Sequence, residues 1–152
     1  MTTEKIELLQ DELVGLQQAA GHLDYSLERC RNLINQEDLP PEQLERLESL
    51  TSRFARLADL LIQRIFRLID EIELTTSGSM LDRIYRAEKR GWAKAIDLIK
   101  IRELRNLIAH EYAADKMQEI YVTVTALSPL LLATVPHVET YALNLIQRYP
   151  RH

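Results

Sequence analysis

The first 34 residues carry an apolar residue at every third or fourth position, and this spacing constrains the fold more than any other feature of the chain. The apolar seam comprises Ile6, Leu9, Leu13, Leu16, Ala20, Leu23, Leu27, Cys30 and Ile34. Residues with this period line one face of an α-helix, and many of the residues between them are acidic. We therefore expect a long amphipathic helix that needs partner helices to bury its apolar face. Pro40 and Pro41 end it, because proline cannot continue a helix but can begin the next one.

The composition favours helices throughout. The chain has 152 residues, of which 46% are hydrophobic and 28% charged, with only four glycines and five prolines. Leu, Ile, Glu, Arg, Ala and Gln dominate, and all of these but Ile rank high in helix propensity. We expect a single helical domain that spans residues 1–152. The single cysteine, Cys30, is typical of a protein of the reducing cytoplasm, and we expect no signal peptide and no membrane span.

The second predicted helix runs from about Pro41 to Leu74. Its later part, LADLLIQRIFRLI (57–69), is apolar on more than one side. A helix with this much apolar surface usually packs on two partners, so we expect a homodimer in which a second chain covers part of it. The alternative is a central helix within a monomer.

Local signals divide the rest of the chain. Ser79, followed three residues later by Asp82, predicts a capping box at the start of a short helix that runs to Arg90. Gly91 suits the position just after a helix, where a positive φ is needed. Further helices are expected over residues 93–109 and 113–127. Ser128 and Pro129 then predict the start of a last segment that runs to about 148 and is kinked at Pro136.

Together these signals predict an all-α protein. The arrangement we expect is an up-and-down helical bundle with one short extra helix.

Charge is unevenly distributed along the sequence. The net charge is −4, but residues 1–50 carry eleven acids and four bases, whereas residues 82–105 carry eight bases and four acids. The basic segment could form a local surface that guides a phosphate backbone to a small site. The alternative is a solvated helix face with interleaved charges.

The residues best suited to catalysis lie in RELRNLIAHEY (102–112), where Arg105, His110 and Tyr112 lie near the end of a predicted helix. A five-residue step turns a regular helix by about 500°, which leaves Arg105 and His110 about 140° apart. The two side chains could converge if the helix loosens near Ala109. They could also meet if a second chain brings its own pair to the same cleft.

These residue types are suited to RNA cleavage without a metal ion. A histidine can exchange protons near neutral pH, and an arginine can hold a phosphate with two hydrogen bonds. Attack by the 2′-hydroxyl of RNA on the adjacent phosphate needs little more, and Asn106 offers an amide as support. The plainer interpretation pairs Arg105 with Asp97 or Glu103 and leaves His110 interacting with the helix dipole.

No other motif suggests catalysis. The sequence has no phosphate loop, no CxxC pair and no HExxH, and we expect no metal site and no cofactor in this chain. We interpret His22, His137 and His152 as surface or packing residues.

The string RNLIAHEY (105–112) resembles the signature of HEPN-domain proteins, in which an arginine and a histidine are separated by four to six residues. Here four residues separate Arg105 from His110, and one residue separates His110 from Tyr112. This spacing resembles the HepT branch of that family. The resemblance extends upstream over residues 79–112, a short helix, a glycine turn and a motif helix. It covers about a quarter of the chain.

The resemblance implies a ribonuclease toxin of a toxin–antitoxin pair, with a composite site formed by the two motif helices of a homodimer. Arg105 and His110 would be catalytic, supported by Asn106. The implied partner is a nucleotidyltransferase antitoxin of the MNT type, which uses ATP and magnesium to transfer AMP onto the motif tyrosine, here Tyr112. The added anionic group would repel the phosphates of RNA.

Two other functions are compatible with the sequence. One is a non-catalytic helical binding partner that presents substrate to a nucleotidyltransferase. The other is a coiled-coil interaction protein built on the first helix, which leaves the motif unexplained.

Overall fold

The computed structural model describes residues 2–75, 78–110 and 114–149, and in this part of the chain the secondary structure is entirely helical. The second helix is one continuous rod made of α2, the π-helical turn η1 and α3. The elements are α1 (Thr2–Cys30), α2 (Pro41–Ala58), η1 (Asp59–Ile65), α3 (Phe66–Ile72), α4 (Met80–Lys89), α5 (Ala95–His110) and α6 (Ala114–Gln147). The prediction of an all-helical bundle with one short extra helix is confirmed.

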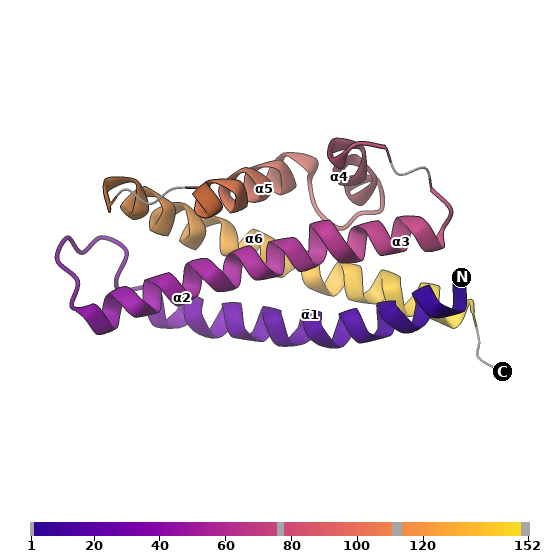
Figure 1. Ribbon diagram of the computed structural model, residues 1–152, viewed down its shortest axis with the longest axis horizontal. Coiled ribbons are helices and arrows are strands. Elements are labelled where there is room, and N and C mark those ends of the chain that lie inside the picture. The colour runs from indigo at the N-terminus through magenta and orange to yellow at the C-terminus, as the bar shows by residue number, and fades with distance from the viewer. Residues whose placement is uncertain (1, 76–77, 111–113, 150–152) are drawn as a thin grey trace.

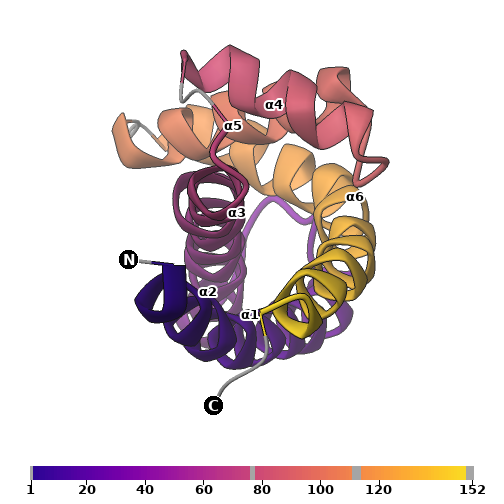
Figure 2. The ribbon, with the colours of Figure 1, turned by 90° about the vertical axis from the view of Figure 1, so that its right-hand side faces the viewer.

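The three long rods run side by side along the length of the molecule (Figure 1). Seen end-on, α1, the second rod and α6 surround a common core, and α4 and α5 cover one side of it (Figure 2). The second rod lies between α1 and α5 and contacts both. This order determines which helices can contribute to one surface.

The predicted seam of α1 forms the core face, as expected from its period. Its buried residues include Leu9, Leu16, Leu23 and Cys30, each fully enclosed. Ala19 takes the buried place expected for Ala20, because the seam drifts around a straight helix over several turns. α1 is therefore held by burial of one face rather than by local propensity alone.

The apolar residues of 57–69 are covered by helices of the same chain. Leu60 is half-buried. The other large apolar residues are fully or almost fully buried: Leu57, Leu61, Ile62, Ile65, Phe66, Leu68 and Ile69. The remaining exposed positions are Gln63, Arg64 and Arg67. Helices of the same bundle therefore cover the apolar surface for which the sequence analysis expected a second chain, as in the alternative of a central helix, and the homodimer stays a prediction.

The start and end of α4 follow their local signals. The Ser79 hydroxyl accepts a hydrogen bond from the Asp82 backbone N–H, and the Asp82 carboxylate accepts one from the Ser79 N–H, at 3.1 and 2.9 Å. Gly91 follows the helix with a φ of +83°, a conformation that suits glycine. Both features confirm the predicted cap and stop.

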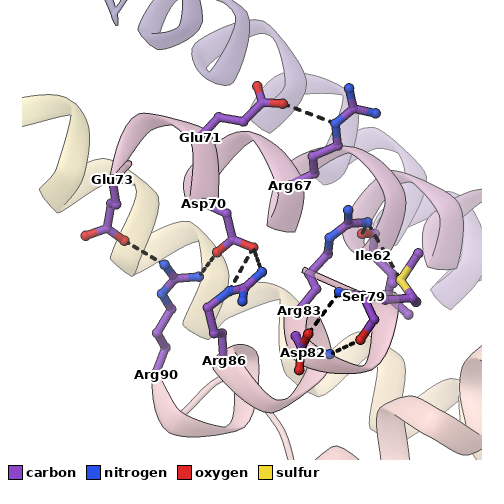
Figure 3. A network of polar contacts seen from close by, with 11 residues as sticks. Ile62, Arg67, Asp70, Glu71, Glu73, Ser79, Asp82, Arg83, Arg86 and Arg90 are labelled. Carbon is purple, nitrogen blue, oxygen red and sulfur yellow. Dashed lines mark hydrogen bonds and ion pairs between the residues drawn. The ribbon is translucent and has the colours of Figure 1, made fainter. Parts of the chain in front are cut away.

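Three arginines of the basic segment are directed inward, which neither interpretation of its charge anticipated, whereas Lys89, Lys94 and Lys100 are exposed. Arg86 and Arg90 donate to the buried carboxylate of Asp70 on α3, and Arg90 also donates to Glu73 (Figure 3). Arg83 donates to the backbone carbonyl of Ile62 at 3.2 Å. These arginines lock α4 onto the second rod, so they do not form a free surface for phosphate.

α6 runs unbroken through both of its prolines, so the predicted start at Ser128 and Pro129 was wrong. Pro129 and Pro136 both lie on the exposed side of the helix. The opposite side, which includes Val124, Leu131 and Val138, is buried and holds the helix together across them.

The residues Lys116–Gln147 of α6 are long and apolar enough to cross a membrane by length and composition alone. The most apolar window of this stretch has a mean hydropathy of 1.4, and 39% of the window is buried inside the bundle.

Candidate functional site

The motif helix α5 presents two different faces. Its inward face is buried and contains Ala95, Leu98, Ile101 and Leu104. A seven-residue step brings Arg105 almost directly over Leu98, so its side chain projects toward the second rod.

Arg105 binds Asp59, the first residue of the π-helical turn. Its Nε donates to Oδ1 at 2.6 Å and its Nη2 donates to Oδ2 at 3.0 Å, a two-pronged pair. The side chains are 34% and 38% exposed, so water and ligands can reach the pair. The hydrogen bond with Asp59 is the main cause of the raised pKa of Arg105, which keeps the guanidinium charged.

This partner was not predicted. Asp97 and Glu103, the acids proposed from sequence, lie on other sides of α5, whereas Asp59 comes from a helix 46 residues earlier. One signal could have indicated it: Asp59 is the only acid within the apolar stretch 57–69. A lone carboxylate on such a helix usually has a cationic partner.

The π-helical turn that begins at Asp59 makes two further hydrogen bonds. The Phe66 N–H donates to the carbonyl of Leu61, a five-residue step that defines the wider helix. Arg83 of α4 donates to the Ile62 carbonyl within the same turn. Arginines from α4 and α5 thus contact both parts of this turn, and π-helical turns are often found at functional sites.

His110 lies on the outer face of α5, away from Arg105. α5 keeps its regular helical form to His110, so the loosening near Ala109 considered from sequence does not occur in the described chain. The side chains of His110 and Asn106 are exposed and lie four residues apart, which places them on one side of the helix. Within one chain, the structure therefore groups Asn106 with His110 and not with Arg105.

Two residues singled out from sequence cannot be placed. Tyr112 and His152 lie outside the described residues. His22 and His137 are exposed, as expected for surface histidines. Among the described residues, no group of three or more His, Cys, Asp or Glu side chains is arranged to hold a metal ion.

The motif helix carries two separate reactive groups, the guanidinium of Arg105 and the imidazole of His110. The Arg105–Asp59 pair uses two of the five N–H groups of the guanidinium, which leaves donors for a phosphate. His110 offers an accessible imidazole for proton transfer. The two lie about 140° apart around α5, so one copy of the helix cannot bring both to one phosphate.

Comparison with known proteins does not assign a family. No family model, no curated protein and no solved structure matches the chain. The similarity to HEPN-domain proteins rests on the motif residues of 79–112 alone.

Proposed function

We propose that this protein is a metal-independent endoribonuclease that cleaves RNA with Arg105 and His110. The observation that carries the proposal is the Arg105–Asp59 pair: a charged guanidinium fixed in direction by a carboxylate and still one-third exposed. Such a group binds a phosphate and stabilises the charge that develops on it during cleavage. The resemblance of 105–112 to the HepT signature supports the same assignment.

The proposed reaction uses the RNA's own 2′-hydroxyl. His110 removes the proton from this hydroxyl, the oxygen attacks the adjacent phosphorus, and the bond from phosphorus to the 5′-oxygen breaks. The leaving oxygen takes up a proton from water or from a second histidine. The products are a 2′,3′-cyclic phosphate and a 5′-hydroxyl, and Arg105 holds the phosphate throughout.

We propose that the active form is a homodimer with a shared site. The 140° separation on a regular helix supports this, because a second copy can present its His110 to the phosphate held by Arg105 of the first. Ile96 and Leu107, 55% and 45% exposed, lie on the same outer side of α5 as His110. Exposed apolar residues beside the histidine suit a surface that a second α5 covers.

We further propose that AMP transfer onto Tyr112 silences the enzyme. The support is the position of Tyr112, two residues beyond the exposed His110, together with the resemblance to HepT proteins and their nucleotidyltransferase partners of the MNT type. An anionic adduct there would repel RNA. Intact-protein mass spectrometry after co-expression with such an enzyme should show added AMP on the wild type and none on Tyr112→Phe. An AMP adduct that is absent from both proteins, or present on both, would contradict this regulation.

The test of the ribonuclease is cleavage of an unstructured RNA in the presence of a metal chelator. His110→Ala should lower the rate by about 100-fold or more, the typical contribution of a positioned acid or base. His137→Ala, which removes an exposed histidine from α6, is the matched control and should cleave like the wild type. Equal cleavage by His110→Ala and wild type would remove the histidine from the mechanism.

A further inference from the structure

A groove runs between α1 and α2 and reaches the residue that holds Arg105. We name it the α1–α2 groove; it consists of two adjoining cavities. The first, of about 770 Å³, is lined by residues that include Tyr25, Arg29, Ser49, Ser52, Arg53 and Arg56. The second, of about 590 Å³, is lined by residues that include His22, Arg56, Asp59 and Arg64. Arg56 lines both cavities, so the two adjoin, and Asp59 lines the second.

The charges of the groove are arranged along its length. The acids of the first cavity, Glu42, Glu45 and Glu48, all lie in the first half of α2, and Glu42 pairs with Arg46 at 2.7 Å. Farther along the rod come Arg53, Arg56 and Arg64. Two acids line the second cavity: Asp59, whose charge is met by Arg105, and Glu12 of α1, which lies 3.9 Å from Arg64.

Two of these arginines differ in how they are held. Arg53 donates to the carbonyl of His22 and to the Ser26 hydroxyl, at 3.1 and 2.7 Å, so it is fixed across the groove. Arg56 is exposed, and within the described residues its side chain has no hydrogen bond or ion pair. An unpaired, exposed guanidinium midway along a groove is available to bind a phosphate.

Tyr25 adds an aromatic surface to the first cavity, next to Ser26, which accepts a hydrogen bond from Arg53. Its side chain is 59% exposed, and the guanidinium of Arg29 lies 5.4 Å from its ring centroid. An exposed ring beside arginines and serine hydroxyls is the combination that binds single-stranded RNA, because bases stack on the ring while cations contact the backbone.

We propose that the α1–α2 groove binds single-stranded RNA, with a base stacked on Tyr25 and the backbone following Arg53 and Arg56 toward the Arg105–Asp59 pair. This rests on the proposed ribonuclease function and specifies how its substrate is held. The basic segment of α4 does not compete for this role, since Arg86 and Arg90 are occupied by Asp70.

The test measures RNA binding in a His110→Ala background, so that the substrate stays intact. Fluorescence anisotropy with a short unstructured RNA should show about tenfold weaker binding for Tyr25→Ala, and nearly unchanged binding for Tyr25→Phe, which keeps the ring. Arg56→Gln should weaken binding and lower the salt dependence of the logarithm of affinity by about 0.7, the value for one neutralised phosphate on a single strand. Lys89→Gln, which removes an exposed cation from α4, is the control and should leave both quantities unchanged.

The outcomes separate the groove from the ribonuclease. Unchanged binding by both Tyr25→Ala and Arg56→Gln would overturn the groove, while His110-dependent cleavage by the wild type would leave the ribonuclease standing. Equally weakened binding by Tyr25→Phe and Tyr25→Ala would also overturn it, because stacking would not be the cause. Weaker binding by Tyr25→Ala and Arg56→Gln without cleavage by the wild type would support the groove and contradict the ribonuclease.

Discussion

Two aspartates in this molecule bind arginine side chains but differ in their access to water. On α3, the side chain of Asp70 is 4% exposed and receives Arg86 and Arg90, whose side chains are 20% and 13% exposed. In η1, Asp59 receives hydrogen bonds from Arg105 alone among the described residues, and both side chains are about one-third exposed or more. The first carboxylate is enclosed and fully used, which suits a structural lock. The second leaves its arginine open to a ligand, which suits a binding site.

The largest expected effect comes from changing the open pair. Arg105→Lys should lower RNA cleavage by about 100-fold or more, because an ammonium cannot bind phosphate and carboxylate with two prongs. The free energy of unfolding should change by less than about 1 kcal/mol, since exposed ion pairs stabilise little. Cleavage assays and urea titrations measure the two quantities. Retained cleavage, or a large drop in stability, would make this pair a structural one.

The enclosed pair should show the reverse behaviour. Asp70→Asn should lower the free energy of unfolding by about 3 kcal/mol, because it removes the buried charge that two partly buried arginines share. Asp59→Asn is the matched variant and should cost about 1 kcal/mol or less. Urea titration of both proteins provides the comparison. Equal decreases would show that access to water does not distinguish the two regions.

The stability of the region around Asp70 and Glu73 should also depend on pH in the alkaline range. Burial, followed by the hydrogen bond to Glu73, raises the pKa of Tyr141. The neutral phenol is therefore favoured in the folded protein. Its stabilisation is present below the ordinary tyrosine pKa of about 10 and is lost as the pH rises through the raised pKa. Denaturant titrations above this pH should show a steeper decline of stability for wild type than for Tyr141→Phe, and parallel curves would contradict the assignment.

The smallest effect is expected at the start of α4. Hydrogen bonds from the backbone and side chain of Ser79 lower the pKa of Asp82. The stabilisation by the ionised carboxylate is present above the ordinary aspartate pKa of about 3.9 and is lost as the pH falls through the lowered value. Thermal unfolding in acid should show a slightly smaller decline in melting temperature for Asp82→Ala than for wild type. An identical decline in both would leave the cap without a role in acid stability.

Local signals predicted the helices well, because they depend on nearby residues. The period of α1, the Ser79–Asp82 cap and Gly91 all act within a few positions along the chain. Pro129 misled the prediction because its effect depends on the side of α6 on which it lies. An exposed proline removes one hydrogen bond facing water, while the buried side of the helix remains continuous.

The candidate site could be predicted only in part. The spacing of Arg105 and His110 gave their angular separation, and the regular form of α5 agrees with it. The Asp59 partner, 46 residues away, depends on the packing of α5 against η1. The inward direction of Arg86 and Arg90 also depends on packing, because both bind the buried carboxylate of Asp70. Such pairings follow from tertiary packing, which local spacing does not encode.

The most direct test of the central claim, a site shared between two copies, is a mixed dimer. One copy carries Arg105→Lys, the other carries His110→Ala, and two different affinity tags allow only heterodimers to be purified. If Arg105 of one copy acts with His110 of the other, each heterodimer has one intact site, and cleavage should return to about half of the wild-type rate. Each single-variant protein alone should remain nearly inactive. A heterodimer as inactive as its parents, or no dimer at all, would contradict a shared site.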